Sequence, residues 1–374
     1  GLKTGIHRIE VDLFKKTGPK SLSVQMRKFD DTTIANIPNA MLYKEGVEAT
    51  PVSSTLSGMV LRQYNIDFTN LPLPLTLENH TANTASLVDM VRVPSGLTGS
   101  YVLEYSGYLD VPRMSNYKFF SSSKDRSRVF IDDQLVVINY RDNGNFTTAH
   151  GSIGMAPGLH RIRVEYFNTA DSGTPFLELT WAGGASGEVP ASNLKRDYVP
   201  IARNIYTIPG LGEVLIEDQG DGLYAITDLS SKQVYGLDDT LIDFRTGDVT
   251  QRWIIGGTPG NYQIINMLSG QYLQDTPSLA IEYSREAQEI MSGYHTIIPT
   301  RLPNMELISN NLLGNNYLRG SNFSNIGDPG DLWNLEYIGC LQYRMATEAT
   351  INNSNPRYFA QQNTSNAIWQ SSDT

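Results

Sequence analysis

A ten-residue segment occurs twice in this chain, and no other feature of the sequence limits the fold as strongly. Residues 5–14 read Gly-Ile-His-Arg-Ile-Glu-Val-Asp-Leu-Phe, and residues 158–167 read Gly-Leu-His-Arg-Ile-Arg-Val-Glu-Tyr-Phe. Their apolar residues fall mostly at every second position, which is typical of a half-buried strand. A duplication of this kind predicts a modular β architecture.

Two further segments repeat in the same order. Leu22-Ser23-Val24 corresponds to Leu177-Glu178-Leu179, and the segment from Ile37 corresponds to the segment from Val189. Only the second copy has a whole domain ahead of it. We therefore expect residues 1–45 to be the last strands of a truncated module and residues 46–200 to be the complete one.

The complete copy carries six landmarks in a fixed order. They are Gly58–Asn65, Gly107–Pro112, Asn116–Phe120, Arg128–Asp133, Gly158–Phe167 and Leu177–Trp181. This order resembles the protective-antigen-type domain of bacterial toxins, glycosidases and fungal adhesins. The resemblance implies a β-sandwich, often one that binds carbohydrate.

Members of that family that bind sugar through calcium have an Asp-Asp pair just before the strand that begins here at Arg128. The corresponding residues are Lys124-Asp125-Arg126, so an ammonium replaces one carboxylate. Adjacent carboxylates suit a hard cation with several oxygen ligands. We therefore expect no cofactor, and Asp125 and Asp132 are the candidates for sugar or calcium should either bind. The alternative for Asp132, which precedes Asp133, is a tight turn.

A second repeat follows residue 200 at intervals of about 40 residues. Its units begin at Tyr224, Tyr262, Met305 and Tyr343, and a Trp or its substitute follows each, at Trp253, Ile290, Trp333 and Trp369. With Gln251-Arg252-Trp253 and Ser269-Gly270-Gln271-Tyr272-Leu273, the pattern resembles the ricin-type lectin repeat. The resemblance implies a β-trefoil over residues 201–374. A trefoil has three units and we count four, so either the first unit is a lead-in or the fourth begins another module.

In ricin-type lectins an Asp just after the Tyr-Leu strand holds the sugar. Asp238 or Asp239 fills that place in the first unit and Asp275 in the second, whereas the third unit has Arg319-Gly320-Ser321. The resemblance makes these aspartates sugar ligands, and the alternative for each is a turn residue. The Trp residues are expected to fill the core.

Composition and motifs exclude several classes of function. Charged residues are 18% of the chain and the net charge is −10, which argues against nucleic acid and anionic membranes as partners. No apolar run approaches the ~20 residues that cross a bilayer. The five histidines include no pair at metal-ligand spacing, and no nucleophile elbow, phosphate-binding loop or dinucleotide motif occurs, so we expect no enzyme. The single cysteine, Cys340, is expected to be a buried, inert thiol.

Five Asn-x-Ser/Thr sequons favour an extracellular or cell-surface location and are the expected glycosylation sites. They are Asn79, Asn145, Asn322, Asn352 and Asn363.

Two functions are consistent with these features. The first is a non-catalytic, adhesin-like segment that binds glycans or cell-wall polysaccharide. The alternative is a structural subunit of an extracellular filament or surface layer, in which residues 1–28 donate strands head-to-tail to an identical subunit.

Overall fold

A computed structural model describes residues 23–26, 33–37, 47–52, 54–66, 77, 80–140, 146–170, 173–287, 293–295, 305–310, 315–320, 333–347, 357–361 and 367–371. The chain divides into two units. The first comprises residues 1–51, 57–75 and 86–196, and the second comprises 52–56, 76–85 and 197–374. The described elements are β-strands and short 3-10 helices, which confirms the all-β prediction. No helix in these ranges is long and apolar enough to cross a membrane.

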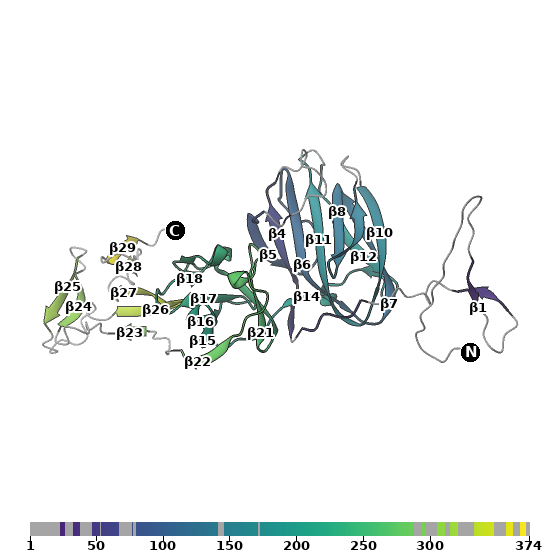
Figure 1. Ribbon diagram of the computed structural model, residues 1–374. Coiled ribbons are helices and arrows are strands. Elements are labelled where there is room, and N and C mark those ends of the chain that lie inside the picture. The colour runs from purple at the N-terminus through teal and green to yellow at the C-terminus, as the bar shows by residue number, and fades with distance from the viewer. Residues whose placement is uncertain are drawn as a thin grey trace. The chain divides into compact units, whose positions relative to one another are not determined.

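The first unit contains a large antiparallel sheet (Figure 1). Its strands run in the order β3-β14-β6-β11-β8-β9, and β4 pairs with β6 and β5 with β4. Their bounds are β3 Thr55–Ser57, β4 Met59–Tyr64, β5 Thr84–Val88, β6 Tyr101–Val111, β8 Arg126–Ile131, β9 Gln134–Asn139, β11 Gly158–Asn168 and β14 Leu194–Asp197. The long strands β6 and β11 pair over their whole length, from Gly158 opposite Val111 to Asn168 opposite Tyr101.

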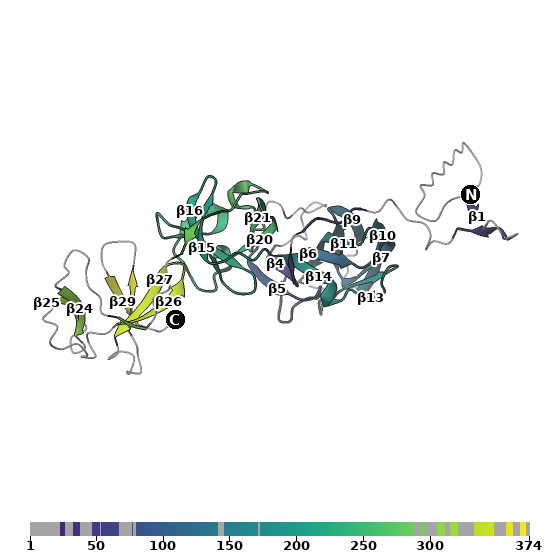
Figure 2. The ribbon, with the colours of Figure 1, turned by 90° about the horizontal axis from the view of Figure 1, so that it is seen from below.

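A second sheet of four strands, in the order β10-β7-β12-β13, forms the other layer of the sandwich (Figures 1 and 2). Its bounds are β7 Ser115–Lys124, β10 Phe146–Met155, β12 Leu177–Ala182 and β13 Gly187–Glu188, and the 3-10 turn η2, Ala191–Asn193, follows. Alternate residues of both sheets are buried in one core, with Tyr105 and Val164 from the large sheet and Phe119 and Trp181 from the small one. The predicted β-sandwich is therefore present.

The two sheets meet closely at one edge, between β9 and β10. A Cβ atom on Gly151 of β10 would lie 1.7 Å from the carbonyl oxygen of Val136 on β9. Only glycine permits this approach of two backbones.

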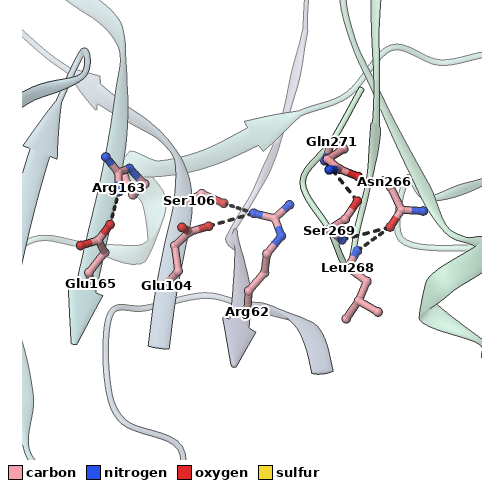
Figure 3. Close-up of polar contacts among 9 residues, drawn as sticks. All are labelled: Arg62, Glu104, Ser106, Arg163, Glu165, Asn266, Leu268, Ser269 and Gln271. Atoms are coloured by element: carbon pink, nitrogen blue, oxygen red, sulfur yellow. Dashed lines mark hydrogen bonds and ion pairs between the residues drawn. The ribbon is translucent and has the colours of Figure 1, made fainter. Parts of the chain in front are cut away.

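The other face of the large sheet carries a row of paired charges among apolar residues such as Val60 and Val102. Arg62 of β4 donates to Glu104 of β6 at 3.2 Å and to Ser106 at 3.0 Å, and Arg163 pairs with Glu165 on β11 (Figure 3). Arg128 of β8 also pairs with Glu165, whose side chain is 1% exposed. Buried charges are tolerated when they are paired in this way.

The N-terminal hairpin repeats the register of the sandwich. In the hairpin of β1, Gln25–Met26, and β2, Ala35–Asn36, Gln25 lies opposite Asn36 and Met26 opposite Ala35. Alignment of the duplicated segments makes these pairs the counterparts of Thr180 opposite Glu188 and Trp181 opposite Gly187. The duplication therefore extends to backbone pairing. Residues 1–22, which include the first copy of the long strand, lie outside the described residues.

The second unit begins with a sheet in the order β19-β18-β17-β16-β15-β22, in which β20 pairs with β17 and with β21. The bounds are β15 Asn204–Ile208, β16 Gly212–Asp218, β17 Tyr224–Asp228, β18 Val234–Tyr235, β19 Leu241–Ile242, β20 Trp253–Thr258, β21 Asn261–Asn266 and β22 Glu282–Glu286. The 3-10 turns are η3 Leu237–Asp239, η4 Val249–Gln251 and η5 Leu273–Asp275. Trp253 is 1% exposed in the core of this sheet, as predicted.

The later strands form a sheet in the order β23-β26-β27-β28-β29 and a β24–β25 hairpin. Their bounds are β23 Gly293–His295, β24 Met305–Asn310, β25 Asn315–Gly320, β26 Trp333–Gly339, β27 Gln342–Thr347, β28 Arg357–Gln361 and β29 Ala367–Ser371. The turn between β26 and β27 is bonded to β16, because Glu217 accepts from the Tyr337 hydroxyl and the Cys340 amide, both at 2.8 Å. The described strands do not show a trefoil.

Candidate functional site

The first two units of the second repeat contain the same local turn. Asp228 at the end of β17 accepts a hydrogen bond from the Ser231 amide at 2.6 Å. Asn266 at the end of β21 accepts from the Leu268 and Ser269 amides at 3.0 and 3.1 Å (Figure 3). Side chains of Asp and Asn form such turns with the backbone that follows them. The repeat that the sequence indicated is therefore present in the contacts of both units.

Each of these turns leads to a short 3-10 segment with left-handed backbone. Asp238 and Asp239 of η3 have φ of 52° and 57°, and Gln274 and Asp275 of η5 have φ of 57° and 50°. Aspartate tolerates this conformation better than most residues because its short polar side chain bonds locally. The three predicted sugar ligands are therefore turn residues, as the alternative interpretation proposed.

The same turns also form a pocket, so the two interpretations do not exclude each other. The pocket has a volume of 150 Å³. It is lined by Asp238, Asp239, Trp253, Asn266, Ser269, Gln271, Tyr272 and Asp275. Aspartates from two turns 36 residues apart in sequence thus share one site, whereas the sequence assigned them to separate sites.

A hydrogen bond between the turns holds the pocket together. The Gln274 amide donates to Oδ2 of Asp239 at 2.7 Å. Burial raises the pKa of the Asp239 carboxyl, and the nearby carboxylates of Asp275 and Asp238 raise it further, while the Gln274 amide acts in the opposite direction. Asp239 is half-buried and bonded to the other turn, whereas Asp238 and Asp275 are exposed.

The free polar groups of the pocket suit a polyhydroxylated ligand. Carboxylates accept hydrogen bonds from hydroxyl groups, and the side-chain amide of Gln271 can both donate and accept hydrogen bonds. Trp253 contributes to the wall without offering a donor, because its Nε1 donates to the Tyr235 carbonyl at 2.9 Å. Ser269 and Gln271 were not predicted as site residues, although the motif that revealed the repeat contains both.

Asp125 lies in the first unit, at the turn between β7 and β8. It is fully buried, has a φ of 70°, and its Oδ2 accepts from the Thr169 amide at 3.0 Å and the Thr169 hydroxyl at 2.8 Å. Its carboxylate therefore fixes the loop that follows β11.

Asp132 lies at the other end of β8. Its carboxylate accepts from the Arg161 amide at 2.8 Å and contacts Nδ1 of His160 at 2.7 Å. Six residues of strand separate it from Asp125, about 20 Å at ~3.3 Å per residue. The structure therefore does not bring the two calcium candidates together. Within the described residues, no three His, Cys, Asp or Glu side chains are grouped as metal ligands.

The five predicted glycosylation sites fall in segments that the structure does not describe. Asn79, Asn145, Asn322, Asn352 and Asn363 all lie outside the described residues.

Comparison with known proteins gives one family match. The PA14 domain model matches residues 57–193, the segment that contains the sandwich. PA14 domains are non-catalytic carbohydrate-binding modules of adhesins and also occur in glycosidases. No curated protein matches the chain.

Several solved structures are similar to parts of the chain. An anti-sigma factor domain-containing protein is 21% identical and has a TM-score of 0.32, and the match covers 45% of this chain and 57% of that one. The PA14 sugar-binding domain from an RTX adhesin is 14% identical with a TM-score of 0.31, covering 38% and 99%. The Epithelial Adhesin 9 A domain from Candida glabrata, in complex with Galβ1-4GlcNAc, is 11% identical with a TM-score of 0.32, covering 40% and 93%. The chain thus spans little more than half the length of the first of these proteins.

Proposed function

We propose that this protein is a non-catalytic, extracellular, adhesin-like segment that binds glycans. The observation that carries the proposal is the pocket in which Asp238, Asp239 and Asp275 meet beside Gln271. The PA14 match over residues 57–193 supports it independently, because PA14 modules of adhesins bind carbohydrate.

We also propose that the second unit is a trefoil built from the repeats that begin at Tyr224, Tyr262 and Met305. The matching turns at Asp228 and Asn266 support it. The bonds from Glu217 to the turn at Cys340 support closure, because they join residues 123 apart in sequence.

The glycan proposal is tested with the complete chain on a glycan array, followed by titration of the best ligand. Asp275→Asn removes a carboxylate while keeping a side chain that tolerates left-handed backbone, and we expect about a tenfold loss of affinity. Asp133→Asn is the matched control, because Asp133 also has a positive φ, of 62°, and lies in the other unit. A blank array, or equal losses in both variants, would contradict the proposal.

A second candidate function, as a subunit of a filament assembled head-to-tail, is favoured by the N-terminal hairpin. Its register copies that of β12 and β13, yet Ile34 is 62% exposed and Met26 half-buried, whereas Trp181 in the complete copy is 3% exposed. In the complete copy β12 also pairs with β7, so an equivalent neighbour from a second chain would bury the hairpin. Deleting residues 1–28 and measuring mass by light scattering tests this, and an unchanged mass would argue against assembly.

A further inference from the structure

The outer face of the four-stranded sheet carries lysines and aromatic rings, although the chain as a whole has a net charge of −10. On β7, Tyr117, Phe119, Ser121 and Ser123 are buried in the sandwich, so Lys118, Phe120, Ser122 and Lys124 point outward. The same alternation holds on β10 and β12. This face therefore presents two lysines and several aromatic rings.

One row of the outer face places a lysine between two phenylalanines. Lys124 of β7 lies opposite Phe146 of β10, and its amide donates to the carbonyl of Phe176 on the other side at 3.0 Å. Phe146 is 58% exposed and Phe176 39% exposed, and their rings meet edge to face with centroids 5.2 Å apart. Exposed apolar side chains that form a contiguous patch are typical of interaction sites.

The ammonium of Lys124 supplies the positive charge of this row. In the described part of the chain no carboxylate forms an ion pair with it. Its Nζ lies beside Gly173, where an added Cβ would be 2.8 Å away, so the ammonium occupies the space that a side chain at this position would fill. On the same face of β12, Glu178 lies opposite Ser122, in the next row.

A cavity adjoins the row at β10. It has a volume of 450 Å³ and lies between the ends of β9 and β10. Tyr140, which is 53% exposed, and Asn139 line it, as does Thr148, whose hydroxyl is 2.8 Å from that of Ser122 on the outer face. The hydroxyls of Ser122 and Thr148 thus lead from the outer face to the cavity.

We propose that this row, Phe146–Lys124–Phe176, is a second glycan site, which binds the carboxylated sugar of an acidic polysaccharide without calcium. The rings of Phe146 and Phe176 offer apolar surface to the C–H face of a sugar ring. The Lys124 ammonium pairs with the carboxylate in a charge-assisted hydrogen bond. The pocket at Asp275 repels such a ligand because it is lined by carboxylates, so the two sites select different sugars.

The test compares two forms of one polymer, polygalacturonate and its fully methyl-esterified form, by titration against the complete chain with EDTA present. We expect the acidic form to bind more tightly and the difference to shrink as salt is added. Lys124→Met should weaken binding of polygalacturonate about fivefold, and Phe146→Ala should do so to a similar extent. Glu178→Gln removes the neighbouring negative charge and should strengthen binding about twofold.

Lys118→Met is the matched control, because it removes a lysine from the same face of the same strand, six residues away. Equal binding of both polymers, dependence on calcium, or equal effects of Lys118→Met and Lys124→Met would overturn the proposal. Failure of this site alone is recognisable, because the glycan array and its sensitivity to Asp275→Asn test the other pocket separately.

Discussion

The contact between His160 and Asp132 supplies a prediction that isolates one charge. His160 is fully buried, with Nδ1 2.7 Å from Asp132 and Nε2 2.9 Å from the Ala156 carbonyl. Asp132→Asn keeps the left-handed backbone, with φ of 46°, and can still accept from the Arg161 amide. The variant therefore removes the negative charge beside the buried imidazole and changes little else.

The size of the expected stability change depends on whether His160 is charged. Burial lowers this pKa, but the hydrogen bonds to Asp132 and Ala156 and the Asp132 charge raise it, and the net direction is upward from 6.5. A hydrogen bond between charged groups contributes about 2 kcal/mol, whereas a neutral one contributes about 1 kcal/mol. Asp132→Asn should therefore lower the free energy of unfolding by about 2 kcal/mol below about pH 6.5 and by about 1 kcal/mol or less once the pH exceeds the folded pKa.

The sign of the pH dependence is fixed by linkage. Because the folded pKa of His160 lies above the unfolded value of about 6.5, the stabilisation by its charged form is complete below that pH. It is lost as the pH rises through the folded pKa. In Asp132→Asn, burial still lowers the pKa of His160, and the Ala156 carbonyl and the Glu48 charge still raise it, so the stabilisation at low pH is reduced.

The assay is urea unfolding of the complete chain at several pH values between 5 and 8, followed by tryptophan fluorescence. Leu179→Ala identifies the transition of the sandwich, because Leu179 is 2% exposed in its core and the substitution shifts that transition alone. A difference between Asp132→Asn and the unmodified protein that does not shrink as the pH rises would refute the role given to the His160 charge.

Three further predictions concern single residues. Lys232 has a φ of 65°, and the equivalent residue of the second repeat unit is Gly270, with a φ of 75°. Lys232→Gly should therefore raise the free energy of unfolding by about 1 kcal/mol, measured by urea unfolding, whereas Lys232→Ala should not raise it. Gly151→Ala should lower the stability of the sandwich by about 3 kcal/mol or more, because its Cβ would overlap the Val136 carbonyl, and an unchanged melting temperature would contradict this. Burial raises the pKa of the Cys340 thiol to about 12, so iodoacetamide at pH 8 should alkylate it only after unfolding, as mass spectrometry would detect.

The β architecture could be predicted from the sequence because alternation and duplication are local patterns. The aligned copies predicted corresponding strands, and the pairing of Gln25 with Asn36 repeats that of Thr180 with Glu188. The second repeat could also be recognised in the sequence, and Asp228 and Asn266 form the same turn in its first two units. Both successes rest on residues close together in the chain.

The roles of the aspartates depended on contacts between distant segments. The sequence could not separate Asp125, which is buried against Thr169, from Asp275, which is exposed in a pocket, because both are aspartates in left-handed turns. Nor could it show that Asp239 and Gln274 are bonded, because that contact joins two repeat units.

By itself, the sequence determined where strands and turns form, since side-chain alternation and turn-forming residues act over a few neighbouring positions. Only the tertiary structure decided which turns share a pocket and which residues flank Lys124 on the outer face of the sheet. Strand pairing sets those neighbours, and it joins residues such as Lys124 and Phe176 that lie far apart in the chain.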